Sequence, residues 1–282
     1  MSFITQSYKL WDNYCHSQNE NKRTFIMAKH KIEDGTSPAV PKYRISIMDK
    51  GPYHIYGQPP LATQHIVTNE AGESWDFKEG RHFSTEQEPT SLCRCGGSKQ
   101  KPYCDGSHLH HKWNPRVTAQ PESILENADI TAGEELTLAD NSQYCAFARF
   151  CDAGEGVWSA TEASFDKTAR RLAIHQASIC PSGRLSIWGN GSDLPIERHY
   201  EPSLGLIEDD AMEASGGLWV RGGIAIFRED GTAYEVRNRT TLCRCGESAN
   251  KPYCDGSHAA LHWRDELEKE VERKEEIVEV YL

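Results

Sequence analysis

An internal repeat constrains this chain more than any other feature. The segment LCRCGGSKQKPYCDGSH at residues 92–108 recurs as LCRCGESANKPYCDGSH at residues 242–258. Such a self-match marks a repeated structural unit. Upstream of each copy, a glycine-bounded segment predicts a short strand, GPYHIYG at 51–57 and GGLWVRG at 216–222. The connection at 57–91 in the first copy is expected to have little regular structure. The sequence therefore predicts two modules of short strands, each followed by a cysteine-rich loop.

Each repeat spaces its cysteines as a metal site would. Two cysteines lie one residue apart, a third follows after a longer gap, and a histidine lies four positions beyond it. The C-x-C pair can aim both thiols at one metal, and the C-D-G-S-H pair can share a face at i and i+4 on a first helical turn. Two pairs predict two metal atoms. The candidate ligands are Cys93, Cys95, Cys104 and His108 in the first copy, and Cys243, Cys245, Cys254 and His258 in the second.

Other motif positions have predicted supporting roles. Glycines after the second and third cysteines let the backbone pass close to a bulky centre. Asp105 and Asp255 are expected to accept backbone N–H groups at the start of the helix. Ser98 and Ser248 are candidates for hydrogen bonds to the sulfurs or to nearby backbone.

Both repeats resemble the CDGSH iron-sulfur family, the NEET proteins, because they meet its pattern C-x-C-x2-S-x3-P-x-C-D-G-S-H at every position. The resemblance implies a 2Fe-2S cluster in each module, with the C-x-C pair on one iron and the third cysteine with the histidine on the other. It also implies small β-rich caps that pair with each other as an intramolecular pseudo-dimer, so the chain is expected to be a monomer. Three thiolates and an imidazole suit structural zinc as well. A disulfide interpretation leaves one cysteine over in each motif.

The segment between the repeats holds three more cysteines, Cys145, Cys151 and Cys180, in QYCAFARFCDAGEGVW and ICPSGRLSIW. Two cysteines, a helical stretch and a late Cys-Pro resemble a divergent mono-cluster ferredoxin domain. Residues 162–178 predict the helix, with Phe165, Ala169, Leu172 and Ala173 at apolar spacing. Three thiolates would suit a 3Fe-4S cluster, but a scaffold without a cluster, whose thiols are buried and free, fits the same residues and both interpretations stay open. Cys15 has no partner at metal spacing, so it is expected to be a plain thiol.

Charge and hydropathy limit the partners. A net charge of -11 argues against nucleic acid and anionic membranes, and it favours a basic docking partner. The apolar stretches are far shorter than a membrane span, and MSFITQSYKLWDNY does not resemble a signal peptide, so a cytoplasmic location is expected. No nucleophile elbow, Walker loop or dinucleotide fingerprint is present, which favours a carrier over an enzyme.

The expected fold is α+β and mainly β, with two CDGSH modules and a ferredoxin-like insert. The predicted divisions are an N-terminal extension (1–37), the first module (38–115), the insert (116–205), the second module (206–263) and a C-terminal helix (264–282). The expected function is electron transfer, with a redox protein or an apo iron-sulfur acceptor as partner. The alternatives are a cluster donor, a redox or iron sensor, and a zinc-bound interaction module.

Overall fold

The computed structural model describes residues 41–267, and within them the fold is mainly β with few short helices, as expected. The predicted N-terminal extension, Cys15 and residues 268–282 of the predicted C-terminal helix lie outside the described residues. Residues 264–267 are not helical. In the described part, no helix is long and apolar enough to cross a membrane.

Two sheets carry the repeated modules. The first has the strand order β11-β1-β2-β5, and the second has the order β12-β10-β9-β3-β4. The first sheet consists of β1 (Arg44–Ile47), β2 (Tyr53–Tyr56), β5 (Thr90–Leu92) and β11 (Ala225–Arg228). The second consists of β3 (Leu61–Thr68), β4 (Ser74–Phe83), β9 (Ser203–Asp209), β10 (Ala214–Arg221) and β12 (Arg239–Leu242).

The two halves of the chain exchange strands. β11, from the second half, pairs in parallel with β1, and β3, from the first half, pairs in parallel with β9. One hydrophobic cluster draws residues from both halves, among them Ile45, Leu61, Leu92, Leu204 and Leu242. These side chains are at most 2% exposed, so both halves depend on one shared core.

The glycine-bounded segments form strands as predicted, since β2 lies within 51–57 and β10 includes Gly216 and Gly217. The prediction for residues 57–91 was wrong, because β3 and β4 form a long hairpin there. The side-chain oxygen of Asn69 accepts N–H groups from Ala71 and Glu73 in its turn. β3 is buried because it pairs with β9, far away in the sequence, and local periodicity does not report such a partner.

The insert forms its own three-stranded antiparallel sheet, β6 (Asp129–Ala132), β7 (Leu136–Asp140) and β8 (Leu185–Gly189). Its helices are α2 (Val157–Glu162) and α3 (Lys167–Ile179). The predicted helix is confirmed from Lys167 onward, but its predicted start was wrong. The Asp166 side chain accepts the N–H groups of Thr168 and Ala169, which fixes the N-terminus of α3 there. Phe165 therefore lies outside α3 and is 63% exposed.

Short helical turns complete the described chain. They are the 3-10 turns η1 (Ser107–Leu109), η2 (Ser142–Tyr144), η3 (Phe150–Asp152) and η4 (Asp210–Met212), and the short helix α4 (Ser257–Ala260).

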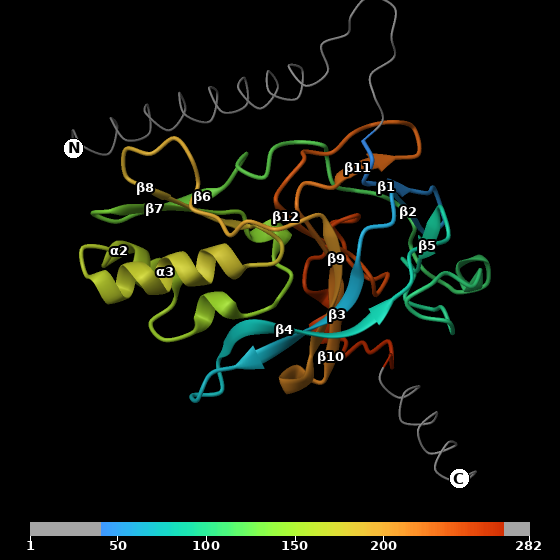
Figure 1. Cartoon of the computed structure of the whole chain (residues 1–282), viewed down its shortest axis with the longest axis horizontal. Helices are drawn as coiled ribbons and strands as arrows, with labels where there is room; N and C mark the ends of the chain where they lie inside the picture. Colours follow the sequence, from blue (N-terminus) through green and yellow to red (C-terminus); the bar gives the residue numbers. More distant parts are fainter. Residues whose placement is uncertain (1–40, 268–282) are drawn as a thin grey trace, which may run out of the picture.

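Two arginines, the buried Arg239 and the half-buried Arg149, join the insert to the second module. Nη1 of Arg239, in β12, donates to the carbonyls of Ala177 (2.8 Å) and Cys180 (2.7 Å), which lack helical partners at the end of α3. Arg149 pairs with Asp209 at 2.6 Å. In Figure 1, α2 and α3 lie on one side of the molecule, β1, β2 and β5 lie on the other, and β9 and β10 run between them.

Candidate metal centres

In both loops the four predicted ligands lie in two pairs. In the first, Sγ of Cys93 is 3.8 Å from Sγ of Cys95, and Sγ of Cys104 is 3.3 Å from Nδ1 of His108. In the second, the corresponding distances are 3.9 Å for Cys243 and Cys245, and 3.3 Å for Cys254 and His258. The repeated spacing thus produces the same local geometry twice.

Backbone hydrogen bonds position these pairs. Cys93 N–H donates to Pro102 O, and Cys104 N–H donates to Ser91 O, both at 2.8 Å. Asp105 accepts the N–H groups of Lys99 (2.8 Å) and Ser107 (2.9 Å). These bonds hold the pKa of Asp105 well below its ordinary value.

The second loop repeats these contacts. Asp255 accepts from Ala249 (2.7 Å) and from Ser257 (3.0 Å). Ser98 and Ser248 donate to the carbonyls of Tyr103 and Tyr253, both at 2.7 Å, so they bind backbone. The prediction that both aspartates accept backbone N–H groups is confirmed.

The two thiols of each C-x-C pair are hydrogen-bonded to each other. The hydrogen bond from Cys95 lowers the pKa of Cys93 to about 6, and the bond from Cys245 lowers that of Cys243 to about 7. The same bonds, together with burial, raise the pKa of Cys95 and Cys245. The lowered pKa of Cys93 and of Cys243 favours the thiolate, which is the form that binds a metal.

The two sites differ in their exposure. Cys104 and His108 are half-buried, whereas Cys254 and His258 are 2% and 5% exposed. Burial, followed by the charge of Arg244, lowers the pKa of His258 to about 4. The second site is therefore the more enclosed of the two.

Residues of the insert cover the second site. A Cβ added at Gly256 would lie 3.1 Å from Cβ of Phe147 and 3.3 Å from the carbonyl oxygen of Cys145. A Cβ at Gly106, which has the same φ of 85°, would meet nothing within 4 Å. The Tyr144 and Tyr253 rings also pack edge to face at 4.9 Å. The segment 144–147 thus caps the second loop, and within residues 41–267 no equivalent segment covers Gly106 in the first loop.

The two cysteine-rich loops contact each other through their backbones. A Cβ at Gly96 would overlap the carbonyl oxygen of Cys245, and a Cβ at Gly246 would overlap that of Cys95. Tyr53, from β2, also donates its hydroxyl to the carbonyl of Cys243 at 2.8 Å. The two candidate sites are therefore direct neighbours.

Each C-x-C pair encloses an arginine that the spacing argument did not single out, although its repetition in both motifs was a signal. Arg94 is 1% exposed and donates to the carbonyls of Met48, Gly51 and Pro115.

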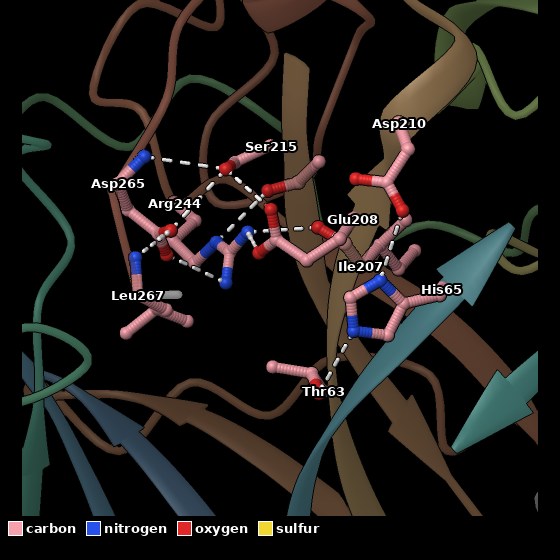
Figure 2. A network of polar contacts seen from close by, with 10 residues as sticks. Thr63, His65, Ile207, Glu208, Asp210, Ser215, Arg244, Asp265 and Leu267 are labelled. Carbon is pink, nitrogen blue, oxygen red and sulfur yellow. Dashed lines mark hydrogen bonds and ion pairs between the residues drawn. The ribbon is translucent and has the colours of Figure 1, made fainter. Parts of the chain in front are cut away.

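Arg244 is 3% exposed and has carboxylate partners. Its Nη2 lies 2.7 Å from Oε1 of Glu208, and its Nη1 lies 3.0 Å from Oδ2 of Asp265. The contact between Arg244 and Asp265 is an ion pair without a hydrogen bond. Figure 2 shows the Arg244 guanidinium between these carboxylates.

Family models match these regions. The model described as iron-binding zinc finger, CDGSH type, matches residues 50–109 and 215–259. The model described as divergent 4Fe-4S mono-cluster matches residues 131–190. The chain is a tandem CDGSH iron-sulfur protein with an insert. No curated protein and no solved structure matched it.

In this CDGSH protein the three cysteines of the insert lie within electrostatic reach of Arg184. Cys151 is in η3, Cys180 directly follows α3, and Cys145 adjoins the second CDGSH loop. Burial raises the pKa of Cys151, and Cys180 adds to that effect. Arg184 is itself held by Asp140 at 2.6 Å. For the described residues, no group of three or more His, Cys, Asp or Glu side chains is arranged around a single metal ion, in the insert or in the CDGSH loops.

Proposed function

We propose that the chain binds two 2Fe-2S clusters and acts in electron transfer. One cluster is held by Cys93, Cys95, Cys104 and His108, and the other by Cys243, Cys245, Cys254 and His258. The sulfur separations of 3.8 and 3.9 Å within the C-x-C pairs carry this proposal. A tetrahedral metal with bonds of about 2.3 Å to sulfur holds two sulfurs about 3.8 Å apart. Each pair therefore has the spacing that one iron requires.

The division of the four ligands into two pairs argues against structural zinc, the alternative that uses the same residues. A single zinc ion needs all four ligands around one point, at about 2.0 to 2.3 Å. Residues 41–267 contain no group of three or more His, Cys, Asp or Glu side chains in such an arrangement. Two separate pairs suit a two-iron centre better.

We also propose that the two modules form an intramolecular pseudo-dimer. The exchange of strands in both directions supports this arrangement, since β3 joins the second sheet and β11 joins the first. The two loops also approach each other through equivalent glycines, Gly96 and Gly246. Two clusters held over one shared core, one more open than the other, suit a relay.

For the insert we propose a ferredoxin-like unit with a third cluster, of the 3Fe-4S type, on Cys145, Cys151 and Cys180. Arg184 supports it, because this one cation lies within electrostatic reach of all three thiols. A scaffold without a cluster is the alternative. The carbonyl of Cys145 lies beside Gly256, so a cluster here would adjoin the second CDGSH cluster.

Anaerobic purification tests the proposal by iron and sulfide analysis, visible absorption and paramagnetic resonance. Two 2Fe-2S clusters give about four iron atoms per chain, and a 3Fe-4S cluster raises this to about seven. Colourless protein containing zinc and no iron would overturn the proposal.

Delivery of a cluster is the second candidate function, favoured by the half-buried His108. Incubation with an apo-ferredoxin separates the two functions. Transfer of iron and colour to the acceptor supports delivery, whereas reversible reduction with intact clusters supports electron transfer.

The partner we propose is a redox protein or an apo iron-sulfur acceptor. The net charge favours a basic partner, but the surface beside the first site carries the exposed residues Lys99, His110, His111 and Lys112. Exposed Leu109 lies among them. An acidic docking face on the partner complements this surface.

A further inference from the structure

We infer that the two CDGSH clusters are unequal electron acceptors, and that the carboxylates of Glu208 and Asp265 make the second cluster the harder one to reduce. An electron added to the chain then resides on the first, more open cluster. This inference rests on the proposed function, because it requires a cluster in both loops. Glu208 and Asp265 act through Arg244, so they are positioning residues.

The repeat provides a matched comparison, because Arg94 and Arg244 occupy the same place in it. Nε of Arg94 donates to the carbonyl of Gly51 and Nη2 to that of Met48, both at 2.9 Å. Nε of Arg244 donates to Gly216 at 2.9 Å and Nη2 to Ile207 at 2.8 Å. Both arginines follow the first cysteine of a C-x-C pair, and equivalent backbone carbonyls hold their guanidinium groups in the same way.

The remaining contacts differ in charge. Nη1 of Arg94 donates to the neutral carbonyl of Pro115 at 3.0 Å, and Asp265 stands at the equivalent position, two residues after the motif tryptophan. Asp49 follows Met48 as Glu208 follows Ile207, but Asp49 is exposed and acts on Arg94 only at longer range.

Both carboxylates of the second site are held in place. Glu208 is 8% exposed and Asp265 is 7% exposed. The hydroxyl of Ser215 donates to Glu208 at 2.5 Å and lies 3.2 Å from Oδ1 of Asp265. Figure 2 shows these groups gathered around Arg244, with Asp210 and His65 apart from them.

The other charged groups of the motifs do not remove the difference. Asp105 and Asp255 occur in both copies, as do Lys101 and Lys251. Lys251 is 3% exposed and would favour reduction of the second cluster. The positive charge of Lys251 opposes the negative charges of two buried carboxylates at the second site. At the first site, Arg94 has no buried carboxylate partner among the described residues.

Reduction adds one negative charge to a cluster. A guanidinium without a carboxylate stabilises that charge, and nearby carboxylates destabilise it, because these interactions are strong away from water. We expect the first cluster to be favoured at least tenfold over the second, which equals 59 mV for one electron.

The test is a redox titration of the intact holoprotein with dithionite and mediators, followed by paramagnetic resonance. Each cluster takes one electron from dithionite, which converts one ferric ion to ferrous. Wild type should show two midpoints at least 59 mV apart. His108→Cys assigns the first cluster, because an added thiolate lowers its midpoint alone.

Matched variants identify the cause. Glu208→Gln and Asp265→Asn should each raise the lower midpoint and leave the upper one unchanged, and Pro115→Asp should lower the upper one. Asp210→Asn is the control, because Asp210 contacts His65 at 3.2 Å and its side chain is 63% exposed. It should shift neither midpoint.

Two outcomes would overturn this inference and leave the proposed function intact. In the first, both clusters bind but have the same midpoint potential. In the second, neither Glu208→Gln nor Asp265→Asn changes the lower midpoint. Protein without iron would overturn both. If one of the two carboxylate variants binds no iron, the lower midpoint of the other variant tests the inference.

Discussion

Glu208 is the buried acid at the second site whose charge changes near neutral pH. Burial raises its pKa to about 7, although Arg244 and the Ser215 hydroxyl lower it. Below that pH the carboxyl is largely neutral, and above it the added negative charge opposes reduction. The midpoint of the second cluster should therefore fall as pH rises from 6 to 8. Redox titrations at the two pH values measure this change.

Glu208→Gln is the variant that isolates this effect, since glutamine cannot ionise. Its second midpoint should depend less on pH over the same interval. An undiminished pH dependence in the variant would assign the effect to another group.

At the same scale, the sequence predicts the ligands but not what surrounds them. Only one residue separates Cys93 from Cys95, as in the second motif, so spacing alone brings the two thiols together. Glu208, in β9, lies 36 positions before Arg244 and reaches it because β9 pairs with β10, and β10 pairs with β12, the strand that ends just before Arg244. A contact that depends on strand pairing has no local signal.

Among the elements, the cap formed by residues 144–147 distinguishes two otherwise equivalent glycines. Gly106 and Gly256 share a φ of 85°, so alanine at either pays about 1–2 kcal/mol for the left-handed conformation. Only at Gly256 does the new methyl also press on Phe147, at 3.1 Å. Gly256→Ala should therefore lower the free energy of unfolding more than Gly106→Ala does. Chemical denaturation of both variants measures the difference. Equal decreases in the free energy of unfolding would mean that Phe147 moves aside without cost.

The predicted elements succeeded where their signals were local. Glycines bounded β2, and apolar spacing located most of α3. β3 and β4 were missed, because β3 owes its burial to β9 across the strand exchange. The start of α3 was misplaced because the Asp166 cap outweighs an apolar pattern that included Phe165.

For the molecule as a whole, strand exchange implies that neither module is stable without the other. Leu204, from the second half, is fully buried and pairs with Leu61, from the first. Leu204→Ala should cost about 2–5 kcal/mol, because it leaves a cavity in a shared core. Leu194→Ala, at a position 71% exposed, is the control and should change stability little.

The manner of unfolding tests this dependence directly. Because β3 completes the second sheet and β11 the first, loss of Leu204 contacts should weaken the supports of both cysteine-rich loops together. In the Leu204→Ala holoprotein, far-ultraviolet circular dichroism and cluster absorbance should fall in one transition, at lower denaturant than in wild type. A transition in which half the cluster absorbance survives would mean that one module keeps its fold alone, and that the exchanged strands add contact without joining the two halves into one cooperative unit.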